Sequence, residues 1–175
     1  SKGVKFINVS PLKSDLETVN NVEWVSIKPN TDVALILALC YEIDKSGATD
    51  RKFIDKYTVG FQRFMKYLDG DIDGVIKNAD WASQITGLSS EAIFDLIKQI
   101  KKSKRTMISV SWSLTRQSHG EQPYWAAIAL ASIIGDIGKP GGGIGFGYSA
   151  MNSIGNHYKK IPAVSIPQGK NNVKK

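Results

Sequence analysis

Cysteine, histidine and long apolar runs are scarce in this chain of 175 residues. Its one cysteine, Cys40, cannot form an internal disulfide, and its position on an apolar helix face predicts a buried structural thiol. The two histidines, His119 and His157, give no spacing that suits zinc, so no metal ligand is predicted. No apolar run reaches the ~18 residues that cross a bilayer, which predicts that the chain has no membrane span.

Positive charge is distributed unevenly along the chain. The formal net charge is +7, but it falls to +2 without the five lysines that follow Gly155, where no acidic residue occurs. A basic tail of this kind is typical of a solvated segment. A nucleic-acid interface would instead interleave arginine and aromatic side chains on one face, so no nucleic-acid partner is predicted.

Short extended runs alternate with amphipathic segments. Strands are predicted at 5–10, 22–27 and 106–112, and helices at 33–41, 50–57, 62–68, 79–85, 91–102 and 125–134. We therefore expect an α/β fold with a Rossmann-like, three-layer arrangement, in which an open, mostly parallel sheet carries helices on both faces. The helix at 125–134 is so apolar that we expect it to be buried on most sides. Residues 1–150 are predicted to form this domain, and 151–175 to form a connecting segment or tail.

The glycine-rich run from Gly141 to Gly147 has the composition of a dinucleotide-binding loop but not its context. That fingerprint needs a strand before the glycines and a helix after them. Here the glycines follow a helix, so a turn is predicted, and a nicotinamide-dependent dehydrogenase is disfavoured. No Gly-x-Ser-x-Gly elbow accompanies either histidine, and no catalytic residue is predicted in this chain.

A polar segment at 113–122 separates the third predicted strand from the apolar helix, where α/β proteins present turns to ligands. Arg116 offers a planar fork for a phosphate or a pterin carbonyl, and Trp112 offers a flat apolar wall. The alternative is a structural ion pair between Arg116 and Glu121 or Asp32. Asp32 itself either caps the helix that follows it or faces outward, where it could accept hydrogen bonds from a ligand such as guanine.

Eight short motifs, in order along the chain, are similar to those of one known family. The motifs are Ser10-Pro11, the run 28–35 (KPNTDVAL), the run 57–61 (YTVGF), Asp80-Trp81-Ala82, the run 112–116 (WSLTR), the run 119–125 (HGEQPYW), the run 138–143 (GKPGGG) and the run 166–171 (IPQGKN). Together they resemble an internal piece of the molybdenum reductases that act on S- and N-oxides, namely dimethyl sulfoxide, trimethylamine N-oxide and biotin sulfoxide reductases.

The resemblance implies that the chain is the α/β domain that binds molybdopterin guanine dinucleotide in an enzyme holding molybdenum between two such cofactors (bis-MGD). It implies the following cofactor-binding residues: Ser10 and Pro11 near the ribose or phosphate, Asn30, Thr31 and Asp32 at the guanosine end, Trp112, Ser113 and Arg116 on the phosphate and pterin side, and His119 and Gly120 close by. Ser10 stands where the family usually has Asn or Asp. The family's serine ligand to molybdenum lies outside the part that aligns, so this chain alone is expected to be inactive.

The same resemblance implies the partners of the intact enzyme. They are the remaining domains of the parent reductase, an S- or N-oxide substrate, and an electron donor such as a c-type cytochrome. A periplasmic location is expected, with a cytoplasmic one as the alternative. The alternative function is a freestanding, non-catalytic α/β module that binds a nucleotide or a protein partner.

Overall fold

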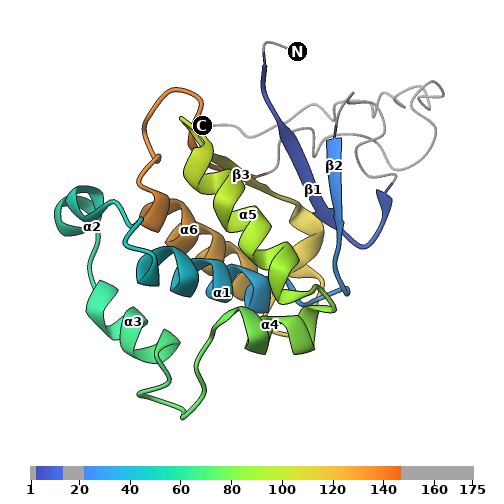
Figure 1. Ribbon diagram of the computed structural model, residues 1–175, viewed down its shortest axis with the longest axis horizontal. Helices are drawn as coiled ribbons and strands as arrows, with labels where there is room; N and C mark the ends of the chain where they lie inside the picture. The colour runs from blue at the N-terminus through green and yellow to red at the C-terminus, as the bar shows by residue number, and fades with distance from the viewer. Residues whose placement is uncertain (1–2, 14–21, 147–175) are drawn as a thin grey trace, which may run out of the picture.

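The computed structural model describes residues 3–13 and 22–146, in which short parallel strands and helices are combined (Figure 1). In chain order the elements are β1 Phe6–Ser10, β2 Val22–Ser26, α1 Asp32–Lys45, α2 Arg51–Tyr57, α3 Phe61–Leu68, α4 Ala79–Thr86, α5 Ser90–Lys102, β3 Met107–Val110, a 3₁₀ helix Trp112–Thr115, α6 Gln122–Ile134 and β4 Gly143–Phe146. The predicted α/β class is therefore confirmed. None of the described helices is long and apolar enough to cross a membrane.

The strands form two parallel pairs rather than one continuous sheet within the described ranges. β1 pairs with β2 from Phe6 opposite Val22 to Ser10 opposite Ser26. β3 pairs with β4 from Met107 opposite Gly143 to Val110 opposite Phe146. The predicted parallel pairing is confirmed.

β4 corrects the prediction that the glycine-rich run at 141–147 is only a turn. Gly143 opens the strand with φ of +103° and donates its N–H to the carbonyl of Thr106 at 3.0 Å. A Cβ atom at this position would lie 3.2 Å from the backbone of Ile137, so glycine is needed for the close approach. Glycine normally weakens a strand, which is why the sequence pattern concealed this one.

Helix α1 is the centre of the hydrophobic core and packs between α6 on one side and α4 and α5 on the other (Figure 1). Ala38 and Cys40 are completely buried within it, and these small side chains let neighbouring helices approach closely. The predicted buried structural thiol is confirmed, and burial raises the pKa of Cys40 far above its usual range.

Helix α6 is less buried than its composition predicts. It begins at Gln122, with Pro123 in the first turn, where a missing N–H costs no hydrogen bond. Ala127 is fully buried, but Trp125 and Ile128 are 61% and 47% exposed. The helix therefore has one buried side and one apolar side that is about half exposed in the described structure.

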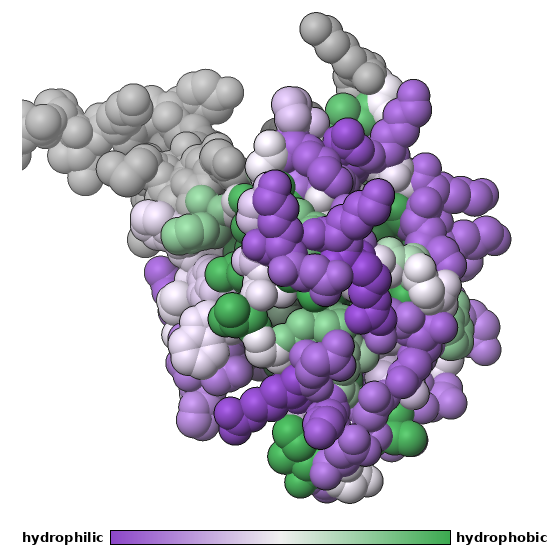
Figure 2. Space-filling view, turned by 90° about the vertical axis from the view of Figure 1, so that its left-hand side faces the viewer, coloured by the Kyte–Doolittle hydropathy of each residue, from purple (hydrophilic) through white to green (hydrophobic). Residues whose placement is uncertain are grey.

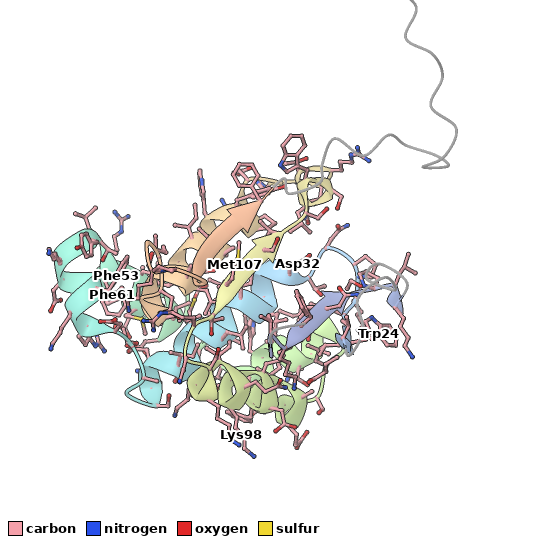
Figure 3. The ribbon with its side chains drawn as sticks, turned by 90° about the horizontal axis from the view of Figure 1, so that it is seen from above. Trp24, Asp32, Phe53, Phe61, Lys98 and Met107 are labelled. Carbon is pink, nitrogen blue, oxygen red and sulfur yellow. The ribbon has the colours of Figure 1, made fainter. Side chains whose placement is uncertain are left out.

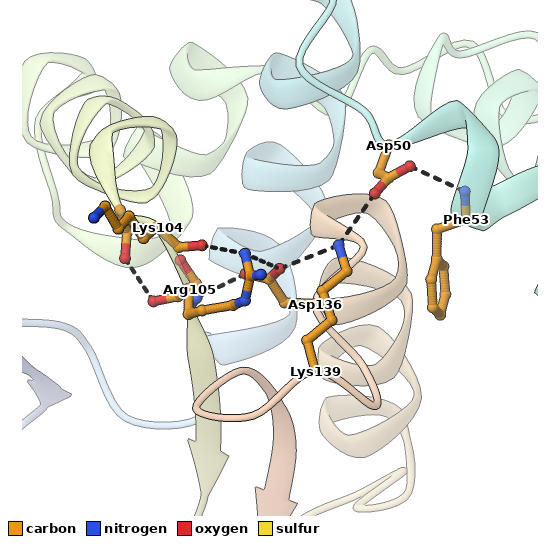
Figure 4. A network of polar contacts seen from close by, with 8 residues as sticks. Asp50, Phe53, Lys104, Arg105, Asp136 and Lys139 are labelled. Carbon is orange, nitrogen blue, oxygen red and sulfur yellow. Dashed lines mark hydrogen bonds and ion pairs between the residues drawn. The ribbon is translucent and has the colours of Figure 1, made fainter.

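A polar network ties the start of β3 to the end of α6 (Figure 4). The carboxylate of Asp136 is buried and accepts a hydrogen bond from the backbone N–H of Thr106 at 2.8 Å. Arg105 and Lys139 lie 3.8 and 3.5 Å from it. Lys139 also lies 3.4 Å from Asp50, the residue that caps α2. On the side of the molecule that carries α2 and α3, hydrophilic side chains dominate the surface (Figure 2).

Candidate cofactor-binding site

The predicted site residues lie where β1, β2 and β3 end and where α1 begins. The carboxyl ends of β1 and β2 lie in the right-hand half of Figure 1, away from α2 and α3. Figure 3 shows Asp32 between Met107, at the start of β3, and Trp24 on β2, and far from Phe53 and Phe61 of α2 and α3. In α/β folds this edge receives ligands, because strands end there and helices begin there with free N–H groups.

The turn between β2 and α1 is tightly held. The backbone N–H of Lys28 donates to the carbonyl of Thr86 at 2.9 Å, and the Thr31 hydroxyl donates to the carbonyl of Lys28 at 2.7 Å. Asn30 has φ of +62°, a left-handed conformation that is uncommon for a residue with a side chain. Such a conformation is held by its surroundings and is found frequently at functional sites.

Asp32 does not act as the helix cap that was one reading of its position. Thr31 is the N-cap residue of α1, and no side chain makes a capping hydrogen bond there. Within residues 3–13 and 22–146, the side chain of Asp32 forms neither an ion pair nor a hydrogen bond with another residue. Burial raises the pKa of its carboxyl above the ordinary value, and a hydrogen bond from its own backbone N–H only partly offsets this. A half-buried carboxylate that is bonded only to its own backbone keeps further lone pairs to accept from a ligand's N–H groups.

Ser10 and Pro11 lie at the carboxyl end of β1, as predicted. The Ser10 side chain is almost buried, and its hydroxyl donates to the carbonyl of Leu12 at 2.5 Å. The Ser10 carbonyl accepts a hydrogen bond from the indole N–H of Trp24 at 3.0 Å. The hydroxyl proton is thus used within the turn, and only its lone pairs remain for a ligand.

The segment after β3 is a 3₁₀ helix, not the end of a longer strand. The expected strand at 106–112 stops at Val110, because the Ser111 hydroxyl accepts from the N–H of Ser113 at 3.3 Å and starts the turn. Trp112 therefore lies in the 3₁₀ helix and is 51% exposed.

Trp112 belongs to a cluster of three aromatic side chains, with Phe146 and Tyr124. The rings of Trp112 and Phe146 are 6.4 Å apart, and those of Tyr124 and Phe146 are 5.9 Å apart. The Tyr124 hydroxyl also donates to the carbonyl of Ser111 at 2.8 Å. Tyr124 and Phe146 were not predicted as site residues. The only sequence signal for Phe146 was its place in the glycine-rich run.

Arg116 is exposed, and in the part of the chain that the structure describes it forms no ion pair with Glu121 or Asp32. The structural bridge that was the alternative for this residue is therefore not seen. Glu121 instead lies 3.8 Å from the Nδ1 atom of His119. His119 has φ of +56°, so it and Asn30 are the two non-glycine residues with positive φ in the described ranges.

Gly120 has a structural reason to be glycine. It is buried, and a Cβ atom built on it would clash with the backbone of Thr115. The same loop thus folds back on the 3₁₀ helix. No cluster of three or more metal-ligating side chains occurs in the two described ranges, and the predicted tail at 151–175 lies outside them.

Comparison with protein families gives a match over almost the whole chain. The family model described as molybdopterin oxidoreductase matches residues 1–174. A biotin sulfoxide reductase of Cereibacter sphaeroides is 49% identical over 166 residues, which cover 94% of this chain and 22% of that protein. A trimethylamine-N-oxide reductase of Haemophilus influenzae is 40% identical over 87% of this chain and 18% of that protein.

A dimethyl sulfoxide/trimethylamine N-oxide reductase of Rhodobacter capsulatus is likewise 40% identical, over 85% of this chain and 18% of that protein. The chain thus spans about a fifth of the length of these relatives. Among solved structures, acetylene hydratase from Pelobacter acetylenicus matches 80% of this chain with a TM-score of 0.65 at 21% identity. This last likeness concerns the fold alone.

Proposed function

The chain belongs to the molybdopterin oxidoreductase family, and from that premise we propose that it is a cofactor-binding domain of a reductase for S- or N-oxides. The relatives that match it carry the names of biotin sulfoxide, trimethylamine-N-oxide and dimethyl sulfoxide reductases. Identity of 49% to one of them supports this function over a freestanding binding module.

The observation that carries the proposal is the half-buried carboxylate of Asp32, to which no other described residue donates a hydrogen bond. A buried carboxylate is unfavourable unless donors reach it, and within the described ranges none does so from another residue. Guanine presents N1–H and N2–H₂ side by side, so both oxygens of Asp32 could accept hydrogen bonds from it. Adenine has no such pair of donors, so this carboxylate would favour guanine.

The remaining residues fit the other parts of a molybdopterin guanine dinucleotide. Asn30 and Thr31 would flank the guanosine, and Ser10 and Pro11 would lie near the ribose or phosphate. Arg116, with its guanidinium unpaired in the described structure, would bind phosphate oxygens, and Ser113 would add a hydroxyl. Trp112 would cover an apolar face of the pterin side, with His119 and Gly120 shaping the loop. The bound cofactor would supply the molybdenum that exchanges an oxygen atom with the substrate, while this domain holds and orients it.

Several finer features belong to the same proposal. In the intact enzyme the two parallel strand pairs would be parts of one sheet, completed by other segments, within a Rossmann-like, three-layer fold. The cofactor would be the bis-MGD form, with its second dinucleotide held by another domain. The enzyme would act in the periplasm, with a c-type cytochrome as its electron donor.

The test is to purify the native protein from its source and to measure its size, molybdenum content and guanine nucleotide content. We expect a chain several times larger than 19.2 kDa, with molybdenum near stoichiometric and reduction of an S- or N-oxide. A native chain of this size that lacks molybdenum and guanine nucleotide would contradict the proposal.

A further inference from the structure

We infer that the carboxyl end of α4, at Thr86 and Gly87, is a positioning element that sets where Asp32 lies. The inference rests on the proposed function, since it concerns how the guanine-binding carboxylate is held. It assigns a role to Lys28, Thr86 and Gly87, none of which was predicted as a site residue. These residues act through Asp32 and need not touch the cofactor.

The contact between α4 and the turn after β2 begins at Thr86, which is held firmly in the core. Thr86 is completely buried, its hydroxyl donates to the carbonyl of Ala82 at 2.8 Å, and its oxygen accepts from the N–H of Leu88 at 3.2 Å. The carbonyl of Thr86 accepts the backbone N–H of Lys28 at 2.9 Å. The end of β2 is therefore held by a hydrogen bond to a residue that cannot move without disturbing the core.

Gly87 adds a steric condition to this hydrogen bond. It ends α4 in the left-handed conformation, with φ of +78°. A Cβ atom at Gly87 would lie 3.1 Å from Cε and 3.4 Å from Cγ of Lys28. The aliphatic part of Lys28 thus lies directly across Gly87, and a Cβ atom there would crowd it, so that the Lys28 side chain has to shift or the turn that carries it has to give way slightly.

Two hydrogen bonds through Thr31 connect Lys28 to the start of α1. The Thr31 hydroxyl donates to the Lys28 carbonyl at 2.7 Å, and the Thr31 carbonyl accepts from the N–H of Ala34 at 3.1 Å. Asn30, in its left-handed conformation, turns the backbone between these bonds. Asp32 is the next residue, so a shift at Lys28 moves the carboxylate that would bind guanine. Hydrogen-bond strength depends on donor–acceptor distance and angle, so even a shift of roughly a few tenths of an ångström weakens recognition by Asp32.

The experiment compares Gly87→Ala with Gly60→Ala in the intact, cofactor-loaded reductase. Gly60 has nearly the same backbone conformation, φ of +82°, but a Cβ atom there meets nothing within 4 Å. Both variants therefore carry the same backbone strain, and only Gly87→Ala presses on Lys28. The measured quantity is the rate at which guanine nucleotide is lost from the loaded enzyme, followed as GMP after acid release, with the melting temperature as a measure of folding.

We expect Gly87→Ala to lose guanine nucleotide roughly threefold to fivefold faster than the unmodified enzyme, since the displaced carboxylate keeps its hydrogen bonds to guanine but makes them in poorer geometry. Gly60→Ala should lose it at the unmodified rate, with a similar fall in melting temperature. In an Asp32→Ala background, Gly87→Ala should add no further acceleration, because the group it positions is gone.

A second pair of variants tests the same path at Thr31. Thr31→Val removes the hydroxyl that bonds to Lys28, and Thr31→Ser restores it. Thr58→Val is the matched control, because the Thr58 hydroxyl makes the same kind of bond to the carbonyl of Ile54 at 2.8 Å, away from the site. Faster loss in Thr31→Val, rescue in Thr31→Ser and no change in Thr58→Val are expected.

Two results separate the inference from the proposal on which it rests. If Asp32→Ala accelerates the loss but Gly87→Ala behaves like Gly60→Ala, the positioning role is refuted and the guanine site stands. If Asp32→Ala leaves the rate unchanged, Asp32 is not the guanine ligand, and both the site assignment and the positioning role are overturned.

Discussion

Replacing Asp32 by asparagine should weaken the proposed binding of guanine while leaving the fold intact. The two side chains have nearly the same shape, and α1 does not use the carboxylate as its cap. An asparagine amide offers one acceptor oxygen and one donor NH₂ group. Against the two neighbouring donors of guanine it can make one hydrogen bond, and its own NH₂ group then faces the second donor.

The size of the effect follows from this exchange. Hydrogen bonds to a charged group contribute roughly 1.5–3 kcal/mol each, and a neutral one about 1 kcal/mol. Losing two charge-assisted bonds and keeping one neutral bond weakens binding by roughly 2–5 kcal/mol. At about 1.4 kcal/mol per tenfold change, guanine affinity should fall by roughly 30-fold to 4000-fold.

The assay is the guanine nucleotide content of the purified, intact reductase, with Asp80→Asn as the control. Asp80 is also a carboxylate in the first turn of a helix, and it accepts a hydrogen bond from Ser90 at 2.6 Å. Its replacement removes a similar charge from a helix start that is not part of the site. Full nucleotide content in Asp32→Asn, or an equal loss in both variants, would refute the reasoning.

The stability of the cofactor-free enzyme should move in the opposite direction. Burial raises the pKa of Asp32 in the folded state above its unfolded value, so the folded protein binds the proton more tightly. The contribution of this group to stability is therefore greatest below its unfolded pKa and is lost as the pH rises through the folded pKa. Asp32→Asn should melt higher than the unmodified apo-protein at neutral pH, and this difference should vanish in acid. A lower melting point at neutral pH would contradict the direction of the shift.

Three further substitutions should have distinct effects. Gly135→Ala should destabilise the protein by about 2 kcal/mol or more, because the residue has φ of +76° and its Cβ would clash with Asp50; chemical denaturation measures this. Asp136→Ala should lower the free energy of unfolding by roughly 1–3 kcal/mol, since it leaves the part-buried N–H of Thr106 without its acceptor and removes a buried carboxylate beside Arg105 and Lys139. Gly120→Ala should lower guanine nucleotide content even where the protein stays folded, because its clash with the backbone deforms the candidate loop itself. Nucleotide content and melting temperature are measured together, and an unchanged content would show that the loop is not part of the site.

The sequence predicted most helices well because their signals are local. The predicted helix at 91–102 is α5, from Ser90 to Lys102, and the Ser89 side chain caps it by accepting from the N–H of Ala92. Its apolar spacing and its cap lie within one stretch of chain. The strand β4 was missed because its glycine is required by a contact that exists only in the tertiary fold. That contact is between Gly143 and the backbone near Ile137.

The site was harder to predict than the helices for a related reason. A capping Asp32 and a ligand-binding Asp32 cannot be told apart in the sequence, and only the hydrogen bonds around α1 exclude the cap; its role as a ligand stays a prediction. The contact between Lys28 and Thr86 joins residues far apart in the chain, and the donor is a backbone N–H that any residue other than proline would supply. Composition and spacing carry no information about such a contact.

The two ends of the domain differ in how completely their polar groups are satisfied. At the amino end of β3, the buried Asp136 accepts a backbone hydrogen bond and lies between two cations. At the carboxyl end, Asp32 is half-buried without a partner among the described residues, and Asn30 and His119 hold left-handed conformations. Evolution for stability alone would remove such features, because a neutral side chain or a glycine would relieve each of them. These three features occur together at the carboxyl end, as expected if a bound ligand donates hydrogen bonds to the Asp32 carboxylate and requires the backbone conformations of the turns at Asn30 and His119.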